Sequence, residues 1–296
     1  MLAGRGLRLH FFALQRLFPQ GVTHRDWLFV ETAAFLHSER TVESIEGERA
    51  MALRNKLLIV QTGAPPAEIE AEHGDLPRWF GRLLAPWRQQ IATVRVYAGE
   101  TLPAPDSQTV AVMTGSWAMV TDRLAWSEKT AAWIRSAMAV EMPLFGICYG
   151  HQLMADALGG EVAYHPAGRE TGCKAITLSA AGRTDPLLSD RPAHFPAHLS
   201  HLQTVVRLPP DATVLAASAH DPHQIVRYTR HALSTQFHPE FTPEIARSLI
   251  HYRDEVLRRE GIDPRQLLDQ VEACPVAAGI LTRFVANYLE PDVPHA

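Results

Sequence analysis

The chain has 296 residues, of which 46% are hydrophobic and 20% charged, the composition of an ordinary globular protein with one large domain or two. A formal net charge of -4 without runs of like charge argues against a nucleic-acid partner, and no apolar stretch approaches the roughly 20 residues that span a membrane. The three cysteines Cys148, Cys173 and Cys274 are scattered and include no CxxC pair. We therefore expect a cytoplasmic protein with no disulfide framework, no metal and no cofactor.

Residues 1–52 precede the first convincing strand and are interpreted as an N-terminal extension. Up to Arg25 they contain four arginines and no acidic residue, with apolar clusters between them, which loosely resembles a transit peptide or an amphipathic surface helix. A start at Met51 is the alternative, because the first apolar run begins five residues later at Lys56.

From residue 53 to residue 250 the chain is assigned to one main domain. Its first half alternates apolar runs with helix-compatible segments, which predicts a parallel sheet covered by helices on both faces. The ligand site is then expected at the carboxyl ends of the strands, where Gly115 and Cys148 fall. Strands are expected at 56–61, 92–97, 109–113 and 143–147, and helices at 76–84, 127–140 and 153–158.

Beyond residue 160 the pattern changes to short β-rich pieces separated by Gly, Asp and Pro turns. Two helices are expected after them, one opened by Thr242-Pro243 and running through Glu255, the other opened by Asp263-Pro264 and running to about Tyr288. Residues 251–296 are therefore assigned to a C-terminal helical segment. The expected strands are 161–164, 174–179, 214–217, 224–229 and 231–237.

Cys148 lies at the turn between the apolar run 143–147 and a helix start. The spacing Gly146-x-Cys148-x-Gly150 follows the logic of the G-x-S-x-G nucleophile elbow, in which glycines admit a strained backbone that exposes the nucleophile. The free N–H groups of the following helix would favour a thiolate. This pattern predicts a reactive cysteine.

A base for this thiol is available in the segment Gln236-Phe-His-Pro-Glu240. His238 and Glu240 are two residues apart, so in a strand their side chains would share one face, and Pro239 stiffens the segment. We hypothesise that Cys148 is the nucleophile, that His238 takes the thiol proton and later protonates the leaving group, and that Glu240 orients the imidazole.

Gly146-Ile-Cys-Tyr-Gly-His-Gln152, followed later by His238-Pro-Glu240, resembles the class I glutamine amidotransferase family, particularly stand-alone members similar to the amidotransferase domain of GMP synthase. The resemblance covers roughly residues 56–250. It implies a three-layer α/β fold of the flavodoxin-like kind, with a mainly parallel central sheet and, here, extra C-terminal helices. It also implies that the backbone N–H groups of Gly115 and Tyr149 bind the oxyanion and that Gln152 contacts the substrate.

One loop departs from the pattern of that family. Ser200-His-Leu-Gln-Thr-Val205 aligns with the loop that holds the two ends of the glutamine substrate, usually Ser-His-Gly-Asp or Asn-His-Gly-Phe. We take His201, Leu202 and Gln203 as substrate-binding positions. Because Leu202 replaces the glycine, selectivity for the amino acid is left open.

Three functions compete at this point. The first is a glutamine amidotransferase or glutaminase, which would hydrolyse the side-chain amide through a cysteine thioester and release ammonia for a separate acceptor enzyme. The second is a γ-glutamyl peptide or amide hydrolase with the same triad, so the small-molecule partner is L-glutamine or a γ-glutamyl amide. The third is a non-enzymatic binding protein on this scaffold. There is no phosphate-binding loop, and the five histidines between residues 194 and 223 fit no metal-ligand spacing.

Overall fold

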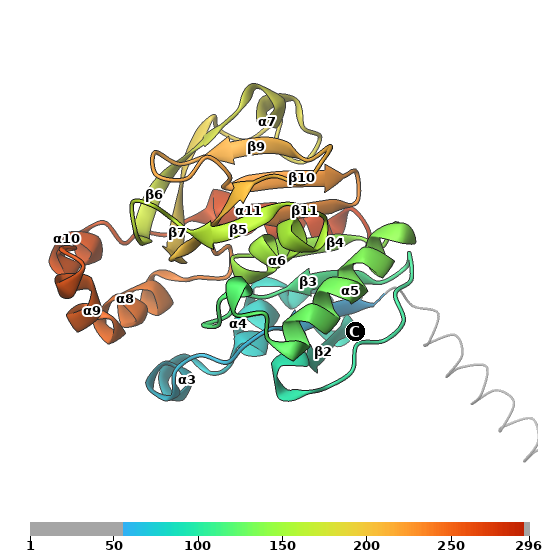
Figure 1. Cartoon of the computed structure of the whole chain (residues 1–296), viewed down its shortest axis with the longest axis horizontal. Helices are drawn as coiled ribbons and strands as arrows, with labels where there is room; N and C mark the ends of the chain where they lie inside the picture. Colours follow the sequence, from blue (N-terminus) through green and yellow to red (C-terminus); the bar gives the residue numbers. More distant parts are fainter. Residues whose placement is uncertain (1–55, 293–296) are drawn as a thin grey trace, which may run out of the picture. The chain divides into compact units, whose positions relative to one another are not determined.

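The computed structural model describes residues 56–292, so the extension expected over residues 1–52 lies outside the described residues (Figure 1). The strands are β1 (Leu57–Gln61), β2 (Ile91–Arg95), β3 (Val110–Met113), β4 (Leu144–Ile147), β5 (Glu161–Tyr164), β6 (Glu170–Leu178), β7 (His194–His201), β8 (Gln203–Arg207), β9 (Thr213–Ala217), β10 (Ile225–Thr229) and β11 (Ala232–Thr235). The α-helices are α3 (Ala67–His73), α4 (Leu76–Leu83), α5 (Ala125–Ala139), α6 (Tyr149–Ala157), α7 (Ala180–Thr184), α8 (Pro243–Tyr252), α9 (Asp254–Arg259), α10 (Pro264–Asp269) and α11 (Pro275–Ala286). Short 3₁₀ helices occupy Ala85–Gln90, Val96–Ala98 and Val120–Asp122.

The larger sheet has nine strands in the order β2-β1-β3-β4-β11-β10-β9-β6-β7. From β2 through β1, β3 and β4 to β11, each strand pairs in parallel with the next. The pairs from β11 onward to β7 are antiparallel, and β5 and β8 form a separate antiparallel pair. The predicted α/β fold with a parallel core is confirmed, and the β-rich second half continues the same sheet in antiparallel fashion.

Helices cover both faces of the parallel core. Alternate residues of β1 enter different hydrophobic clusters, as expected for side chains that alternate between the faces of a sheet. Leu57 belongs to the cluster that contains Phe80 of α4 and Phe284 of α11, whereas Leu58 belongs to the cluster that contains Ile134 of α5. Strands β1, β3 and β4 are buried on both sides, which is why they are visible in the sequence as continuous apolar runs.

The C-terminal helices are shorter than the sequence predicts. The helix expected from Asp263 to Tyr288 is two helices, because Pro275 stands at the first position of α11 and cannot continue a helix that precedes it. The ring of Phe284 in α11 lies 5.2 Å from that of Phe145 in β4, so this helix contributes to the main core. The division between residues 250 and 251 stays a prediction.

Strands β7 and β8 are absent from the sequence-based expectations. The sequence of β7 is rich in histidine and contains Pro196, and a proline within a run argues against a central strand. In the structure β7 is the edge strand of the sheet, where a missing N–H is tolerated. This strand carries Ser200 and His201 toward Cys148, so the segment expected as a loop is the junction of two strands.

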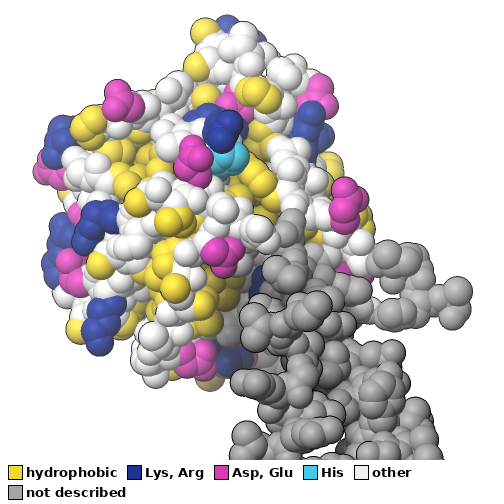
Figure 2. Space-filling view, turned by 90° about the vertical axis from the view of Figure 1, so that its right-hand side faces the viewer, with side chains coloured by type: hydrophobic (Ala, Val, Ile, Leu, Met, Phe, Trp, Pro, Cys, Tyr) yellow, Lys and Arg dark blue, Asp and Glu magenta, His cyan; other side chains and the backbone are white. Residues whose placement is uncertain are grey.

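Within residues 56–292 no helix is both long enough and apolar enough to cross a membrane. On the face shown in Figure 2, basic and acidic side chains are interspersed with hydrophobic and uncharged ones. Charges of both signs therefore occupy this face without separating into patches.

Candidate active site

Cys148 forms the turn between β4 and α6, where the sequence predicts a nucleophile elbow. Its φ of 50° and ψ of -97° lie in a region that residues with a side chain rarely adopt. Its N–H donates to the carbonyl oxygen of Thr235 in β11 at 2.8 Å, which ties the turn to the neighbouring strand. Its sulfur lies 4.0 Å from the carbonyl oxygen of Ser200 at the end of β7. The thiol is thus held between two strands.

The glycines on either side of Cys148 serve a different purpose from the one expected. The strained residue is Cys148 itself, and neither glycine has a positive φ. A Cβ atom on Gly146 would lie 2.6 Å from the carbonyl oxygen of Gly150, and one on Gly150 would lie 2.7 Å from that of Met113 in β3. The two glycines therefore allow α6 to pack against β3 and β4 at a distance that no side chain permits.

His238 and Glu240 meet in the segment that follows β11. Nδ1 of His238 lies 2.7 Å from Oε1 of Glu240, and because a carboxylate only accepts, Nδ1 carries the proton. The main-chain N–H of His238 donates to the carbonyl oxygen of His198 at 2.9 Å, and the Phe241 ring stacks on the imidazole with centroids 4.0 Å apart. The expected strand ends earlier, at Thr235, so a turn rather than a strand brings the two side chains together.

The environment of His238 favours its protonated form. Burial is the largest single influence and lowers its pKa, but the charge of Glu240 and then that of Cys148 outweigh it, and together they raise the pKa of His238 to about 10. Nε2 of His238 is buried and has no hydrogen-bond partner among residues 56–292. His238 can therefore hold a proton on the nitrogen that is not engaged with Glu240.

Gly115 lies against both of these residues. A Cβ atom at this position would lie 3.0 Å from Cε1 of His238 and 3.6 Å from Cβ of Cys148. The Gly115 carbonyl accepts from the hydroxyls of Thr62 and Thr114 at 2.9 Å and 3.0 Å, which fixes the peptide plane after β3. A side chain here would displace the imidazole, so the close approach itself requires glycine.

Tyr149 is the first residue of α6. The N–H groups in the first turn of a helix have no acceptor within the helix, so the main-chain N–H of Tyr149 is available to a ligand beside Cys148. Its phenol points elsewhere and donates to Oγ of Ser127 at 2.6 Å, while burial raises the pKa of Tyr149 to about 12. Only the backbone of this residue can act as an oxyanion donor.

The four predicted substrate-binding residues, Gln152, His201, Leu202 and Gln203, line one cavity of about 180 Å³ together with Cys148. Nε2 of Gln152 donates to the carbonyl oxygen of Gln203 at 2.6 Å, and Nδ1 of His201 faces the same oxygen at 2.9 Å. Nε2 of His201 lies 2.9 Å from the buried carboxylate of Glu170. These contacts hold the polar side chains in the wall of the cavity.

Arg253, which no sequence pattern singled out, also lines this cavity. Arg169 is the other cation in the lining, and its guanidinium makes two hydrogen bonds to Glu260, at 2.7 Å and 3.0 Å. Arg253 donates to Oγ of Ser200 and has no carboxylate within 4.0 Å among residues 56–292. Burial first, and then the charge of Arg169, lower the pKa of Arg253 to about 10. The sequence does not indicate a binding role for Arg253, because cationic side chains are common at the C-terminal ends of helices.

A second, narrow cavity lies on the side of His238 and shares Cys148, Trp117 and Arg253 with the first. Apolar side chains form much of its wall, and Nε1 of Trp79 and Nε1 of Trp117 are buried there without an acceptor among the described residues. Glu240 also has one carboxylate oxygen, Oε2, without a donor. Unsatisfied polar atoms in a cavity mark places where a bound molecule can form hydrogen bonds. The apolar and aromatic lining residues are Leu76, Trp79, Trp117, Phe241 and Leu249.

Replacing Glu240 with Gln should lower the pKa of His238, because the neutral amide removes a negative charge that raises it. The titration of the His238 Cε1 proton by NMR measures this, in a Cys148→Ser background that removes the cysteine sulfur from both proteins. The exposed residue Glu244 supplies the control, since Glu244→Gln should leave the pKa unchanged. An unshifted titration in the Glu240→Gln protein would contradict the assignment.

The pH dependence of unfolding gives a second readout of the same charge in the otherwise wild-type chain. The folded-state pKa of about 10 exceeds the ordinary value of 6.5, so the stabilisation from His238 is complete below pH 6.5 and is lost as the pH rises through about 10. The free energy of unfolding should therefore fall less steeply over this range in Glu240→Gln than in the wild type.

Comparison with known proteins agrees with the fold and the motifs. The family model for class-I glutamine amidotransferases matches residues 111–254. The chain is 36% identical over 181 residues to the glutamine amidotransferase-like protein YfeJ of Salmonella typhimurium, a match that covers 58% of this chain and 74% of YfeJ. It is 40% identical over 99 residues to the GMP synthase of Thermomicrobium roseum, covering 33% of this chain and 18% of that enzyme.

The fold is also that of solved structures. A glutamine amidotransferase of Thermotoga maritima superposes with a TM-score of 0.65 at 23% identity, covering 80% of this chain and 99% of that chain. One from Methylobacillus flagellatus gives a TM-score of 0.65 at 21% identity and covers 82% and 99%. Since the match to YfeJ covers most of that protein, the chain belongs to the class-I glutamine amidotransferase family.

Proposed function

We propose that the protein hydrolyses the side-chain amide of glutamine to glutamate and ammonia. The observation that carries this proposal is the arrangement around His238, whose Nδ1 is bound to Glu240 at 2.7 Å while its buried Nε2 has no partner in the described part of the chain. Cys148 and His238 line the same cavity, and the charge of Cys148 raises the pKa of the imidazole. A nucleophile, a base and an orienting carboxylate are the components of a hydrolytic triad.

In the proposed mechanism the Cys148 thiolate attacks the amide carbon, and the carbonyl electron pair moves onto the oxygen. The tetrahedral intermediate collapses, the C–N bond breaks, and Nε2 of His238 gives its proton to the departing ammonia. His238 then takes a proton from water, which attacks the γ-glutamyl thioester. The S–C bond breaks, glutamate leaves, and the thiolate and imidazolium are restored.

The oxyanion would be bound by the main-chain N–H groups of Gly115 and Tyr149. The N–H of Gly115 shares a peptide plane with the Thr114 carbonyl, which accepts from the N–H of Gly150 at 3.2 Å, and Tyr149 stands at a helix start, so neither donor needs to reorganise during the reaction. Loss of one such donor typically costs about 3 kcal/mol of transition-state stabilisation. This role rests on the positions of the two residues beside Cys148.

The fate of the ammonia is a further part of the proposal. The match to the GMP synthase covers only 18% of that enzyme, so the greater part of its length has no counterpart in the aligned segment. We place the acceptor on a separate enzyme, and we place both proteins in the cytoplasm, where thiols stay reduced. No cofactor is required for hydrolysis by a cysteine triad.

Replacement of Cys148 by Ala should abolish ammonia release from glutamine, because no other group supplies the thioester. His238→Asn should lower kcat by about 10²–10⁴-fold, the usual contribution of a general acid–base group. His251→Asn, at an exposed position on α8, is the matched control and should keep wild-type turnover.

Covalent labelling of the wild-type chain provides an internal control for the same assignment. A glutamine-derived diazoketone should modify the peptide that contains Cys148, and the peptides that contain Cys173 and Cys274 should remain unmodified in the mass spectrum. Turnover in Cys148→Ala, or equal labelling of all three cysteines, would end the proposal.

Arg253 is proposed to bind the α-carboxylate of the substrate. Glutamine and every γ-glutamyl amide with a free glutamyl end carry this group. In the cavity that contains Cys148, Arg253 offers a guanidinium to which none of residues 56–292 brings a carboxylate partner. Arg169 is already bound to Glu260 and is less available. An incoming carboxylate would compensate the charge of Arg253 where water is partly excluded.

Arg253→Met should therefore raise KM for glutamine at least tenfold with a smaller change in kcat, the signature of lost uniform binding. With 4-aminobutanamide, which lacks the α-carboxylate, the wild type and the variant should perform equally. Arg258→Met, at an exposed position paired with Asp254, is the control and should leave KM unchanged. A KM that does not respond in Arg253→Met would remove this residue from the substrate site.

The second cavity favours one alternative, the hydrolysis of γ-glutamyl amides of small apolar amines. His238 protonates the leaving group, so that group departs on the side of the cavity lined by Trp79, Trp117 and Leu249. Ammonia has no alkyl group to contact this wall, whereas an alkylamine does.

The kcat/KM values for glutamine and for its side-chain N-methyl and N-ethyl amides distinguish the two substrates. We expect glutamine to have the highest value, because Gln152 and the complete triad match enzymes that act on it. Each methylene group that finds a matching apolar wall can change kcat/KM by about tenfold or more. Values that rise from glutamine to the N-ethyl amide would assign the protein as a γ-glutamyl amide hydrolase.

A further inference from the structure

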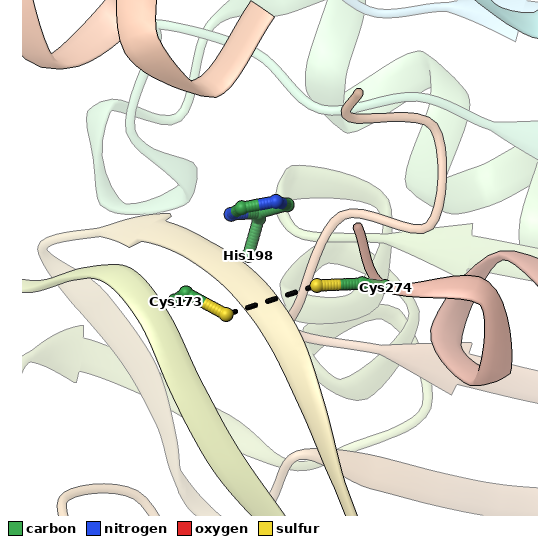
Figure 3. Close-up of side chains that lie close together, drawn as sticks. All are labelled: Cys173, His198 and Cys274. Carbon is green, nitrogen blue, oxygen red and sulfur yellow. Dashed lines mark hydrogen bonds between the residues drawn. The ribbon is translucent and has the colours of Figure 1, made fainter. Parts of the chain in front are cut away.

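Cys173, His198 and Cys274 converge in a place that the proposed chemistry does not use (Figure 3). Cys173 on β6 and His198 on β7 are direct partners across two antiparallel strands, and Cys274 immediately precedes α11. Residues that are 25 and 76 positions apart are thus brought together only by the fold. This explains why their spacing fits no ligand template in the sequence.

The geometry of the three side chains matches part of a tetrahedral metal site. The two sulfur atoms lie 3.7 Å apart, and one ligand atom from each residue lies within 4.8 Å of the others. With Zn–S bonds of about 2.3 Å, two thiolates on a tetrahedral Zn²⁺ ion stand about 3.8 Å apart. The observed sulfur separation therefore needs almost no change to admit an ion.

The hydrogen bonds of His198 leave one of its two ring nitrogens with a free lone pair. Its Nε2 lies 3.0 Å from the carbonyl oxygen of Glu272, and because a carbonyl only accepts, Nε2 carries the proton. Nδ1 then has the lone pair, and it is buried with no donor among residues 56–292. A ring N–H fixed by a backbone carbonyl is the usual support for a ligating histidine.

A second group with metal-ligand side chains, formed by Glu170, His201 and Asp221, has a different character. Glu170 accepts hydrogen bonds from Ser218 at 2.6 Å and from Gln224 at 2.8 Å as well as facing His201. The oxygens of Asp221 also have donors. That group is satisfied by its own network, whereas the cysteine group contains an orphaned acceptor and two sulfurs that have only each other and weak backbone contacts.

We propose that Cys173, His198 and Cys274 form a binding site for Zn²⁺, with water as the fourth ligand. Thiolate and imidazole ligands select this ion over Mg²⁺ or Ca²⁺, which prefer oxygen. Cys173 also lines an open cavity of about 930 Å³, which gives a hydrated ion access to the site. Binding releases the two thiol protons to solvent and changes no oxidation state.

The site would connect the start of α11 to β6 and β7. The carbonyl oxygen of His198 accepts the main-chain N–H of His238, so the ion would also fix the residue that positions the proposed base. This structural role does not depend on the proposed reaction, because binding can be measured without substrate.

The test uses the full-length chain with the Cys148→Ser substitution, which prevents Zn²⁺ from binding the proposed catalytic thiol. The protein is stripped with EDTA under a phosphine reductant, incubated with Zn²⁺ alone, separated from free ion by gel filtration, and analysed for metal by mass spectrometry. We expect one Zn²⁺ per chain. Adding Cys173→Ser, Cys274→Ser or His198→Asn should each lower the affinity at least tenfold, and adding His194→Asn, an exposed position on the same strand, should not.

Co²⁺ provides a measurement that needs no substitution in the trio. Its complex with the Cys148→Ser chain should show an intense near-ultraviolet band from thiolate-to-metal charge transfer, and added Zn²⁺ should remove it. Retention of less than 0.1 Zn²⁺ per chain without the cobalt band would overturn the proposal, as would full retention in the Cys173→Ser variant. A chain that binds no ion but forms a Cys173–Cys274 disulfide in peroxide would equally overturn it and identify a redox pair.

Discussion

The left-handed conformation of Cys148 is the constraint on which the rest of the site depends. Such a conformation costs about 1–3 kcal/mol and persists only where neighbouring structure enforces it. Here the N–H of Cys148 is bound to Thr235, and Gly146 and Gly150 let α6 pack tightly against the strands beneath it. Because β11 ends at Thr235 and the chain then leads to His238, the same strand pairing that holds the thiol also sets the position of the imidazole.

The sequence predicts those parts of the fold whose signal is local. The inner parallel strands β1, β3 and β4 are buried on both faces and appear as apolar runs, and the turn at Cys148 is marked by two glycines. Contacts between residues far apart in the sequence decide the remaining parts of the fold. The edge position of β7 makes Pro196 acceptable, and Pro275 divides the last helical region although its surroundings favour helix. The contact between His238 and Glu240 was expected for the wrong reason, since a turn and not a strand creates it.

Most of the evidence for a ligand beyond the sequence motifs comes from buried donors and charges that have no partner among the described residues. A buried indole N–H without an acceptor costs about 1–3 kcal/mol, and two such groups, Trp79 and Trp117, occur in the cavity beside His238. Arg253 likewise has a charge that no carboxylate of the described residues pairs with. Neither feature is visible in sequence, because an unmet hydrogen bond is a property of what surrounds a residue. Both point to a ligand that supplies acceptors and negative charge.

Strand β7 links the proposed triad to the cysteine group. It pairs with β6 on one side only, so it is held by fewer backbone hydrogen bonds than an interior strand. Its final residues place the Ser200 carbonyl 4.0 Å from the Cys148 sulfur, and the carbonyl of His198 orients His238. The two residues are two positions apart, about 7 Å along an extended strand, so a shift of one displaces the other. A cation bound at His198 would tie this edge strand to the start of α11 in addition to its pairing with β6, and it would therefore act on both the nucleophile and the base.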